Sequence, residues 1–459
     1  MSVQILLILT FVIGYAAIAL EHPLKVDKAA SAILLGVVCW VLLVLGRASL
    51  VPEIPAEEVH SHTADGTVGF IVSELSHALG NAAQVLFFLM GAMTIVELVD
   101  AHEGFKVITD RITSRKRVTL VWIFGLVTFF LSAALDNLTT SIVMISLARK
   151  LVDDKEDRWM LGGVVIIAAN AGGAWSPIGD VTTTMLWIGG QVTASGIIRH
   201  LFLPSLACLV APLLVLSIRL KGEIAPAQPA NDGDDKLEPV APGERRVVFT
   251  LGVGALLFVP VFKTVTHLPP FMGVLFGLGV LWIVTEVMHR TKKREIKSAL
   301  SVISTLQRID IPTILFFLGI LLAVDSLKVA GQLHGLAHVL DRSIGNVYVV
   351  DAAIGLLSAV VDNVPLVAAS TGMYPIATPE AAQAQAEMAM YVVDGDFWQM
   401  LAFCAGTGGS VLIIGSAAGV AVMGIEKMDF VWYLRRVSLL ALVGYVAGAV
   451  ACWLSLRAS

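Results

Sequence analysis

The stretch Leu131-Ser132-Ala133-Ala134-Leu135-Asp136-Asn137 returns later in the chain as Leu357-Ser358-Ala359-Val360-Val361-Asp362-Asn363. Each copy places an Asp-Asn pair at the end of an apolar run. A carboxylate inside hydrocarbon costs about 3 kcal/mol and usually marks an ion or proton path. Two such carboxylates at matching positions of a duplicated chain predict a transporter with a pseudo-symmetric site where the repeats meet.

The composition places the chain in a membrane. It is 57% apolar and 15% charged with a mean hydropathy of +0.83, whereas soluble domains are about 25% charged. Long apolar stretches along the whole length predict an all-α polytopic membrane protein. The apolar N-terminal stretch from Ile5 to Leu20 has no basic flank, so we expect a retained helix rather than a signal peptide. The sequence has no basic patch that would suggest nucleic acid as a partner.

The chain divides into two similar halves. A polar stretch rich in Pro, Ala and Asp at 221–246 predicts a cytoplasmic linker between a first repeat, 1–220, and a second repeat, 247–459. The Gly-rich segment 168–180 aligns with 404–416, and Phe87-Phe88-Leu89 aligns with Phe316-Phe317-Leu318. The Lys- and Arg-rich stretches 111–117 and 289–294 should both be cytoplasmic. Because one follows and the other precedes the Phe-Phe-Leu helix of its half, the repeats should have inverted topology.

The spacing of basic residues predicts a re-entrant hairpin in each half. Basic residues flank the 31 residues from Val118 to Ala148 on both sides. Two crossings would need about 40 residues, and one crossing would place the flanks on opposite sides. A hairpin with its tip at Asp136 fits both facts, and Asp362 should form the second tip. Gly and Pro at 172–179 and 406–419 predict one broken helix per half. We expect about five spans, one hairpin and one broken helix in each repeat.

Oxygen-bearing side chains gather at these tips and breaks. A sodium ion prefers hard oxygen ligands from carboxylates, amides, hydroxyls and carbonyls, as other hard cations do. The predicted cation and proton site comprises Asp136, Asn137, Thr139, Asn170, Ser176, Asp180, Thr182, Thr183, Ser358, Asp362, Asn363 and Ser410. We expect Na⁺ itself at Asp136, Asn137, Asn170 and Asp180, because the second half has Gly406 and Ser416 at the last two positions. Burial favours the uncharged form of a carboxylate, so a proton and a metal ion can compete for the same oxygens.

Simpler interpretations of these residues remain open. Asp136 or Asp362 could cap the start of a helix, although a capping carboxylate can also bind an ion. Ser358 could bond its own helix backbone. Glu97 and Asp325 stand near helix ends, where they are either solvated or part of a peripheral proton route.

The motifs closely resemble those of NhaD-type sodium/proton antiporters, of the ion transporter superfamily. The resemblance rests on the run from Ser132 to Ser141, on Asn170 to Thr183, and on Ser358 to Pro365. It implies secondary active exchange of Na⁺ or Li⁺ for H⁺ across a bacterial inner membrane, most active at alkaline pH. It also implies a homodimer in membrane lipid, with a scaffold portion and a moving transport portion. Transport roles then fall on Asp136, Asn137, Asn170, Asp180, Thr182, Thr183, Ser358, Asp362 and Asn363.

Two other functions compete with cation exchange. An anion transporter of the same superfamily, for carboxylates or arsenite, would need basic residues near the hairpin tips, where the sequence shows only Asp. An intramembrane aspartyl protease could use Asp136 and Asp180, but the residues before them, Leu135 and Pro177 to Gly179, do not match that pattern. We therefore expect a transporter and not an enzyme, with no cofactor beyond the transported Na⁺, Li⁺ and H⁺.

Overall fold

The computed structural model describes residues 3–19, 21–47, 66–109, 112, 114–223 and 240–458. Within these ranges the regular structure is helical, apart from isolated bridge residues such as the antiparallel pair Lys116 and Glu223. In the same part of the chain, eight helices are long and apolar enough to cross a membrane. The predicted all-α polytopic membrane fold is therefore confirmed. The helix α1 (Val3–Ala19) is apolar too but is one residue short of that length criterion.

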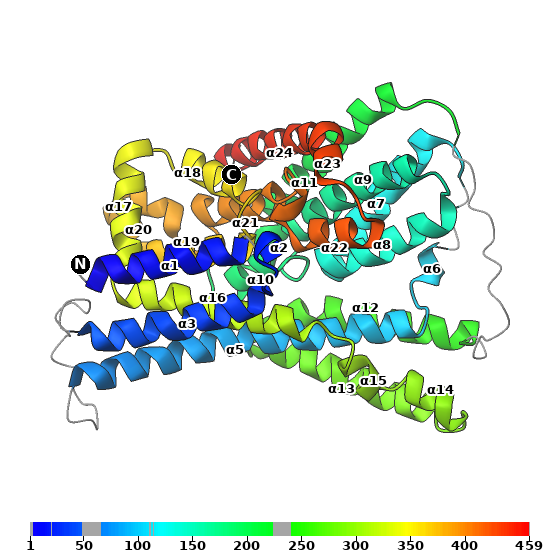
Figure 1. Cartoon of the computed structure of the whole chain (residues 1–459), viewed down its shortest axis with the longest axis horizontal. Helices are drawn as coiled ribbons and strands as arrows, with labels where there is room; N and C mark the ends of the chain where they lie inside the picture. The colour runs from blue at the N-terminus through cyan, green and yellow to red at the C-terminus, as the bar shows by residue number, and fades with distance from the viewer. Residues whose placement is uncertain are drawn as a thin grey trace.

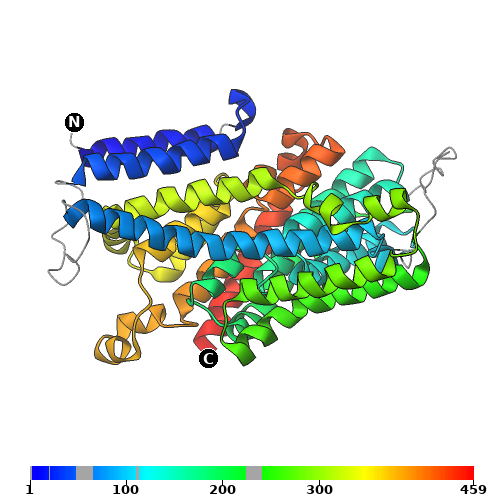
Figure 2. The ribbon, with the colours of Figure 1, turned by 90° about the horizontal axis from the view of Figure 1, so that it is seen from below.

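One bundle is built from long helices, which we call the long-helix bundle. It comprises α1, α3 (Lys28–Leu45), α5 (Gly66–Ala101), α12 (Pro242–Thr266), α13 (Pro270–Met288) and α16 (Ile311–Val329). The short helix α2 (Glu21–Leu24) joins α1 to α3. Helices α1 and α3 lie side by side along one edge of the molecule (Figure 2). Gly36 and Gly319 let α3 approach α16 closely, since a Cβ on Gly36 would lie 2.7 Å from the Gly319 carbonyl oxygen. The Trp40 indole then donates to the Leu322 carbonyl at 2.8 Å.

The second bundle, which we call the hairpin bundle, holds the interrupted helices. It comprises α7 (Arg117–Ala134), α8 (Asn137–Leu151), α9 (Lys155–Ala174), α10 (Val181–Ile188), α11 (Ala194–Arg219), α18 (Val347–Leu357), α19 (Asn363–Met373), α21 (Asp396–Gly408), α22 (Ala417–Glu426) and α24 (Ser438–Ala458). Figure 1 shows most of it above α3, α5, α12, α13 and α16, while α1 overlaps its lower part in this view. Shorter helices connect these elements: α6 (Lys106–Thr109), α14 (Arg294–Ala299), α15 (Val302–Leu306), α17 (Gln332–Ile344), α20 (Pro379–Ala384), η2 (Ala386–Tyr391), η3 (Ile413–Gly415) and α23 (Phe430–Arg436).

Two helix pairs turn back on themselves at the Asp-Asn motifs. At the base of α7 and α8, Arg117 pairs with Asp157 at 2.8 Å, so the start of α7 lies beside the segment that follows α8. At the base of α18 and α19, the Tyr374 hydroxyl donates to Asp341 at 2.9 Å, which closes that pair in the same way. The first pair lies toward one end of the molecule and the second toward the other (Figure 1). The inverted relation of the whole repeats stays a prediction.

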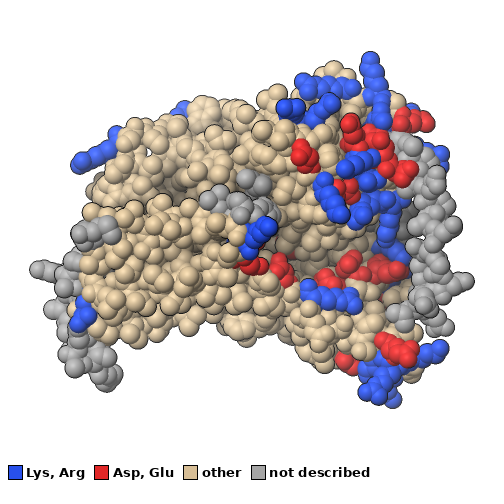
Figure 3. Space-filling view, in the orientation of Figure 1, with Lys and Arg blue, Asp and Glu red and all other residues tan. Residues whose placement is uncertain are grey.

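Lys and Arg gather at one end of the visible face (Figure 3). Ion pairs hold helix ends together there, including Arg158 with Glu426 at 3.1 Å and Lys292 with Glu244 at 2.5 Å. Such clustering of basic residues is typical of a cytoplasmic face. Residues 224–239 of the predicted linker at 221–246 lie outside the described residues. Residues 242–246 form the start of α12.

A pair of histidines joins α5 to α13 beyond the ends of these helices. The rings of His102 and His289 stack with centroids 4.9 Å apart, and their Nε2 atoms are 3.3 Å apart. His102 Nδ1 donates to the Leu98 carbonyl at 2.7 Å. In the neutral pair this leaves His102 Nε2 as the acceptor and His289 Nε2 as the donor.

Candidate functional site

Each broken helix restarts at a capping side chain. The chain leaves α9 at Ala174 and starts α10 after Asp180, whose Oδ1 accepts from the Thr182 backbone N–H at 2.8 Å and from the Thr182 hydroxyl at 2.7 Å. In the second half α22 starts after Ser416, whose hydroxyl accepts from the Gly419 N–H at 3.1 Å. Both breaks place half-helix ends and backbone carbonyl groups inside the bundle, and such groups can bind ions.

Two glycines allow the broken helices to touch the hairpins. A Cβ on Gly172 would lie 2.2 Å from the Phe129 carbonyl oxygen of α7, and one on Gly408 would lie 1.8 Å from the Gly355 carbonyl oxygen of α18. No side chain fits at either distance. The same close approach occurs in both halves, and it brings each break against its hairpin tip.

A buried network of amide, carboxylate and hydroxyl groups forms where the two halves meet. Asn137 Nδ2, at the start of α8, donates to Asp180 Oδ2 at 2.6 Å and to Asn170 Oδ1 at 3.0 Å. Asn170 Nδ2 donates in turn to the hydroxyls of Ser410 and Ser416 at 2.8 and 3.0 Å. Asn170 is fully buried and Asp180 is 2% exposed. The network therefore concentrates hard oxygen atoms in a space that water barely reaches.

Several predicted site residues instead make hydrogen bonds outside this network. Asp136 caps α8, where its carboxylate accepts from the Thr139 N–H and hydroxyl at 2.7 and 2.8 Å. The Ser358 hydroxyl donates to the Ala405 carbonyl at 3.2 Å. The Ser176 hydroxyl donates to the Ala133 carbonyl of α7 at 2.6 Å. The Thr183 hydroxyl donates to the Ser176 and Asp180 carbonyls of the first break, and Asn363 is buried at the start of α19. The structure thus joins Asn137, Asn170, Asp180, Thr182 and Ser410, and places Asp136 with Thr139 beside them.

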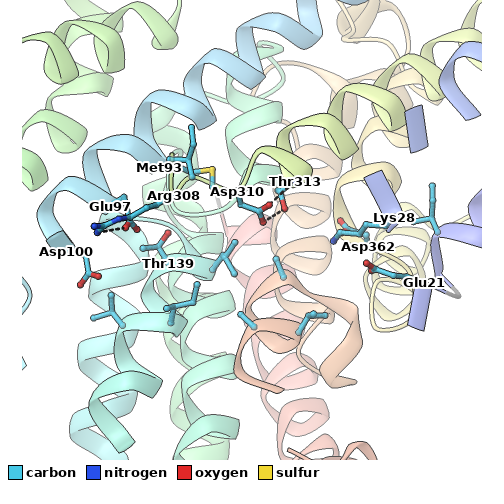
Figure 4. Close-up of a pocket in the computed structure, with 18 of the residues that line it drawn as sticks. Glu21, Lys28, Met93, Glu97, Asp100, Thr139, Arg308, Asp310, Thr313 and Asp362 are labelled. Atoms are coloured by element: carbon cyan, nitrogen blue, oxygen red, sulfur yellow. Dashed lines mark hydrogen bonds and ion pairs between the residues drawn. The ribbon is translucent and has the colours of Figure 1, made fainter. Parts of the chain in front are cut away.

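The second hairpin tip has a basic neighbour that the sequence analysis missed. Asp362 caps α19 by accepting from the Val364 N–H at 3.1 Å, and its other oxygen lies 3.9 Å from Lys28 Nζ (Figure 4). The expectation that only Asp residues stand near the tips was wrong. Lys28 is the first residue of α3, more than three hundred residues earlier in the chain, so no local pattern around Asp362 could reveal it.

Two cavities flank the tips and the breaks. The larger, about 690 Å³, is lined by Thr139 and Asp362 at the tips and extends to Glu97 and Asp100 on the last turns of α5 (Figure 4). Glu97 pairs there with Arg308 at 3.7 Å. The smaller, about 330 Å³, lies between α5, α10, α16 and α19 and includes Asp325 among its lining residues. Glu97 and Asp325, which the sequence placed near helix ends, thus each line a cavity.

Sequence reasoning also missed Asp351, in the first helix of the second hairpin. Its side chain is 0% exposed, and neither carboxylate oxygen has a hydrogen-bond partner among the described residues. Its only sequence signal is one acidic residue in an apolar helix. A carboxylate in such surroundings is stable only when it is uncharged.

Known proteins resemble the chain along nearly its whole length. A family profile described as citrate transporter matches residues 5–393. Sodium/proton antiporter 1 of Arabidopsis thaliana is 51% identical over 96% of this chain and 71% of its own length. Sodium/proton antiporter 2 of the same plant is 47% identical over 96% of this chain and 97% of its own length.

The chain also resembles a bacterial antiporter in sequence and a transporter of known structure in fold. The Na(+)/H(+) antiporter NhaD of Vibrio cholerae is 30% identical over 96% of this chain and 90% of its own length. The crystal structure of the Alcanivorax borkumensis YdaH transporter, described as having an unusual topology, aligns with a TM-score of 0.57 at 12% identity, over 94% of this chain and 99% of that one. The latter shows a shared fold alone. On sequence, the chain belongs to the NhaD-type sodium/proton antiporters, within the group that the citrate transporter profile describes.

Proposed function

We propose that this protein is a secondary active transporter that exchanges Na⁺ or Li⁺ for H⁺ by alternating access. Its relatives are named as sodium/proton antiporters, and the buried network at the break of α9 and α10 offers the ligands such exchange needs. The observation that carries the proposal is the pair of hydrogen bonds from Asn137 to Asp180 and Asn170. These bonds join a hairpin tip to a broken helix around a buried carboxylate.

The exchange follows from the chemistry of that carboxylate. Asp180 is shielded from water, so its negative charge needs a proton, a cation or hydrogen-bond donors. A sodium ion would displace the Asn137 amide donor and turn the amide oxygen toward itself. Asn170, Thr182 and the carbonyls of the break would supply further oxygens. When a proton binds Asp180 instead, the carboxylate loses the charge that holds the ion. Proton and cation then alternate on the same group.

The two cavities support alternating access. The larger reaches the end of α5 that lies toward the Lys- and Arg-rich face, and we infer that this conformation opens to the cytoplasm. The hairpin bundle would move against the long-helix bundle to open the smaller cavity, which lies beside Asp325 and Lys328. We also propose a homodimer in membrane lipid. The bacterial inner membrane stays a proposal that the Vibrio relative supports, while relatives of higher identity come from a plant.

A fluorescence assay in everted membrane vesicles tests the function. A pH-sensitive dye is quenched by respiration-driven acidification, and Na⁺, Li⁺ or K⁺ is then added. We expect Na⁺ and Li⁺ to restore fluorescence with the wild-type protein. Asp180→Asn and Asp136→Asn should abolish the response although the proteins insert, whereas Asp153→Asn on an exposed loop should leave it unchanged. Near-normal responses from both site variants would show that Asp180 and Asp136 are not the ion ligands. No response from the wild-type protein would show that the proposed function is wrong.

Anion transport remains the second candidate, because Lys28 stands near a tip and the matching profile is described as citrate transporter. Lys28 is already opposed by Asp362, and Glu21, Asp310 and Glu97 line the same cavity. Such an acidic lining disfavours a multivalent anion. If citrate uptake into vesicles were stimulated by the protein while Na⁺ moved no protons, anion transport would replace the proposal.

A further inference from the structure

The N-terminal helix pair brings a lysine to the tip of the second hairpin. Lys28 begins α3, and its Nζ lies 3.9 Å from Asp362 Oδ2 and 4.7 Å from the centroid of the Phe316 ring. The side chains of Lys28 and Asp362 are 28% and 21% exposed. The pair is thus partly shielded from water, and its attraction is less screened than that of a surface pair.

The surroundings of this pair are polar in a mostly apolar region. The hydroxyl of Tyr15, on α1, is buried and has no hydrogen-bond partner among the described residues. Tyr15 lines the larger cavity, together with Glu21, Lys28 and Asp362, which Figure 4 labels. The other charged groups that line it are Glu97, Asp100, Arg308 and Asp310. Tyr15 belongs to α1, and Glu21 and Lys28 begin α2 and α3.

The ion pair connects the two bundles. Lys28 and Phe316 belong to the long-helix bundle, whereas Asp362 caps α19 in the hairpin bundle. A movement that separates the start of α3 from the start of α19 would lengthen this contact. The first tip is built differently, since Asp136 accepts both its hydrogen bonds from Thr139 of its own helix. That contact can travel with the hairpin unchanged.

We propose that Lys28 is an internal cation that competes with Na⁺ for Asp362, and that its pairing holds the hairpin bundle in the conformation seen here. This inference rests on the proposed function and assigns Lys28 as a positioning residue for it. A carboxylate oxygen that faces an ammonium group offers less negative potential to a sodium ion. Lys28 therefore weakens ion binding at the second tip while the larger cavity is open, and it compensates Asp362 once the ion has left.

Removing the charge of Lys28 tests this competition. In the vesicle assay, Lys28→Met should lower the apparent KM for Na⁺ about fivefold, the factor that a coupling of about 1 kcal/mol gives. Lys28→Arg keeps the charge and should stay within about twofold of the wild-type KM, less than 0.5 kcal/mol. Lys25→Met, in the exposed turn before α3, is the matched control and should leave KM unchanged. A purely structural role would not tighten Na⁺ binding.

A double variant shows whether Lys28 acts through Asp362. Lys28→Met should change KM far less when Asp362 is already Asn, because the partner charge is then absent. If Lys28→Met fails to insert, Lys28→Gln keeps a polar head without charge and must show the same fall in KM. An unchanged or raised KM in the inserted variant, or equal effects in both backgrounds, overturns the proposal. Wild-type vesicles that exchange no Na⁺ for H⁺ would instead overturn the proposed function.

Discussion

The break between α9 and α10 carries a carboxylate, whereas the break between α21 and α22 carries a hydroxyl at the matching position. Asp180 accepts from Asn137 across the interface with the first hairpin, and Ser416 accepts from Asn170 of the other half. Both residues also cap the helix that follows. The backbone architecture is thus common to the two halves while the charge is not. A duplicated framework can keep its geometry and place the carboxylate of the break in one copy alone.

The largest expected effect comes from making the two breaks alike. Asp180→Ser gives the first break the chemistry of the second, and it should abolish Na⁺-dependent proton movement because the buried network loses its only carboxylate. Ser416→Ala removes one acceptor from Asn170, and it should lower the maximal rate less than tenfold, a loss of about 1 kcal/mol. Dye responses in vesicles with matched protein content measure both. Equal losses from the two variants would show that the halves contribute equally.

The second largest effect should be on stability, and it tests the close packing of each broken helix against its hairpin. Gly172→Ala and Gly408→Ala each force a methyl group against a carbonyl oxygen of the neighbouring hairpin. Each should destabilise the protein by about 1–3 kcal/mol, the usual cost of overpacking. A Cβ on Gly406 would lie 3.3 Å from the Ala174 Cβ, which needs a shift of only a few tenths of an ångström, so Gly406→Ala is the milder control. Thermal unfolding in detergent orders the three variants, and a Gly408→Ala protein as stable as Gly406→Ala would contradict the shared packing.

A smaller effect, on the pH dependence of stability, should come from the pair His102 and His289 between the two halves. Burial lowers the pKa of His102, and burial together with the adjacent His102 ring lowers the pKa of His289 to about 4. The charged groups around them are Lys292, Glu244 and Glu286. An unfolded histidine titrates near pH 6.5. The folded protein therefore keeps the full contribution of the pair above about pH 6.5 and loses it as the pH falls toward 4.

His289→Gln isolates this contribution, because the glutamine amide can still donate to His102 Nε2 but cannot be protonated. Both proteins should unfold at a lower temperature at pH 4.5 than at pH 7. We expect this decrease to be about 2–4 °C smaller for His289→Gln than for the wild type. His200→Gln, at a residue that is not part of this pair, serves as the control and should follow the wild-type curve. If the unfolding temperatures of all three proteins changed equally with pH, the histidine pair would not contribute to the loss of stability in acid.

The smallest effect on exchange should come from Asp351, a second buried aspartate. Asp351 is as shielded as Asp180 but has no hydrogen-bond partner among the described residues. If it stays protonated, Asp351→Asn replaces a neutral acid by a neutral amide of similar size. Exchange should then stay within about twofold of wild type, less than 0.5 kcal/mol. A complete loss of exchange would place a second transported proton in the α18 helix and enlarge the role of the second half.

The sequence predicted the parts of this architecture that depend on local pattern. Basic flanks and the short distance between them predicted the turn at Asp136, and Gly172, Pro177 and Gly179 predicted the first break. The contact of Asn170 with Ser410 and the approach of Lys28 to Asp362 could not be predicted in this way. Each joins segments more than two hundred residues apart, and only the packing of the two bundles determines which polar groups meet. The capping role of Asp136, in contrast, depends only on its own helix, and the sequence predicts it as one of two alternatives.

The length of α5 determines where the larger cavity opens. Its 36 residues extend about 54 Å at 1.5 Å per residue, and even a 40° tilt leaves about 41 Å along the bilayer normal. The hydrocarbon layer is only about 30 Å thick. About 11 Å of the helix must therefore lie outside the hydrocarbon layer, and we expect the final turns, with Glu97 and Asp100, to be that part because they end toward the Lys- and Arg-rich face. Anionic lipids concentrate cations at that depth, so the Na⁺ that reaches the mouth depends on the lipid mixture as well as on bulk salt.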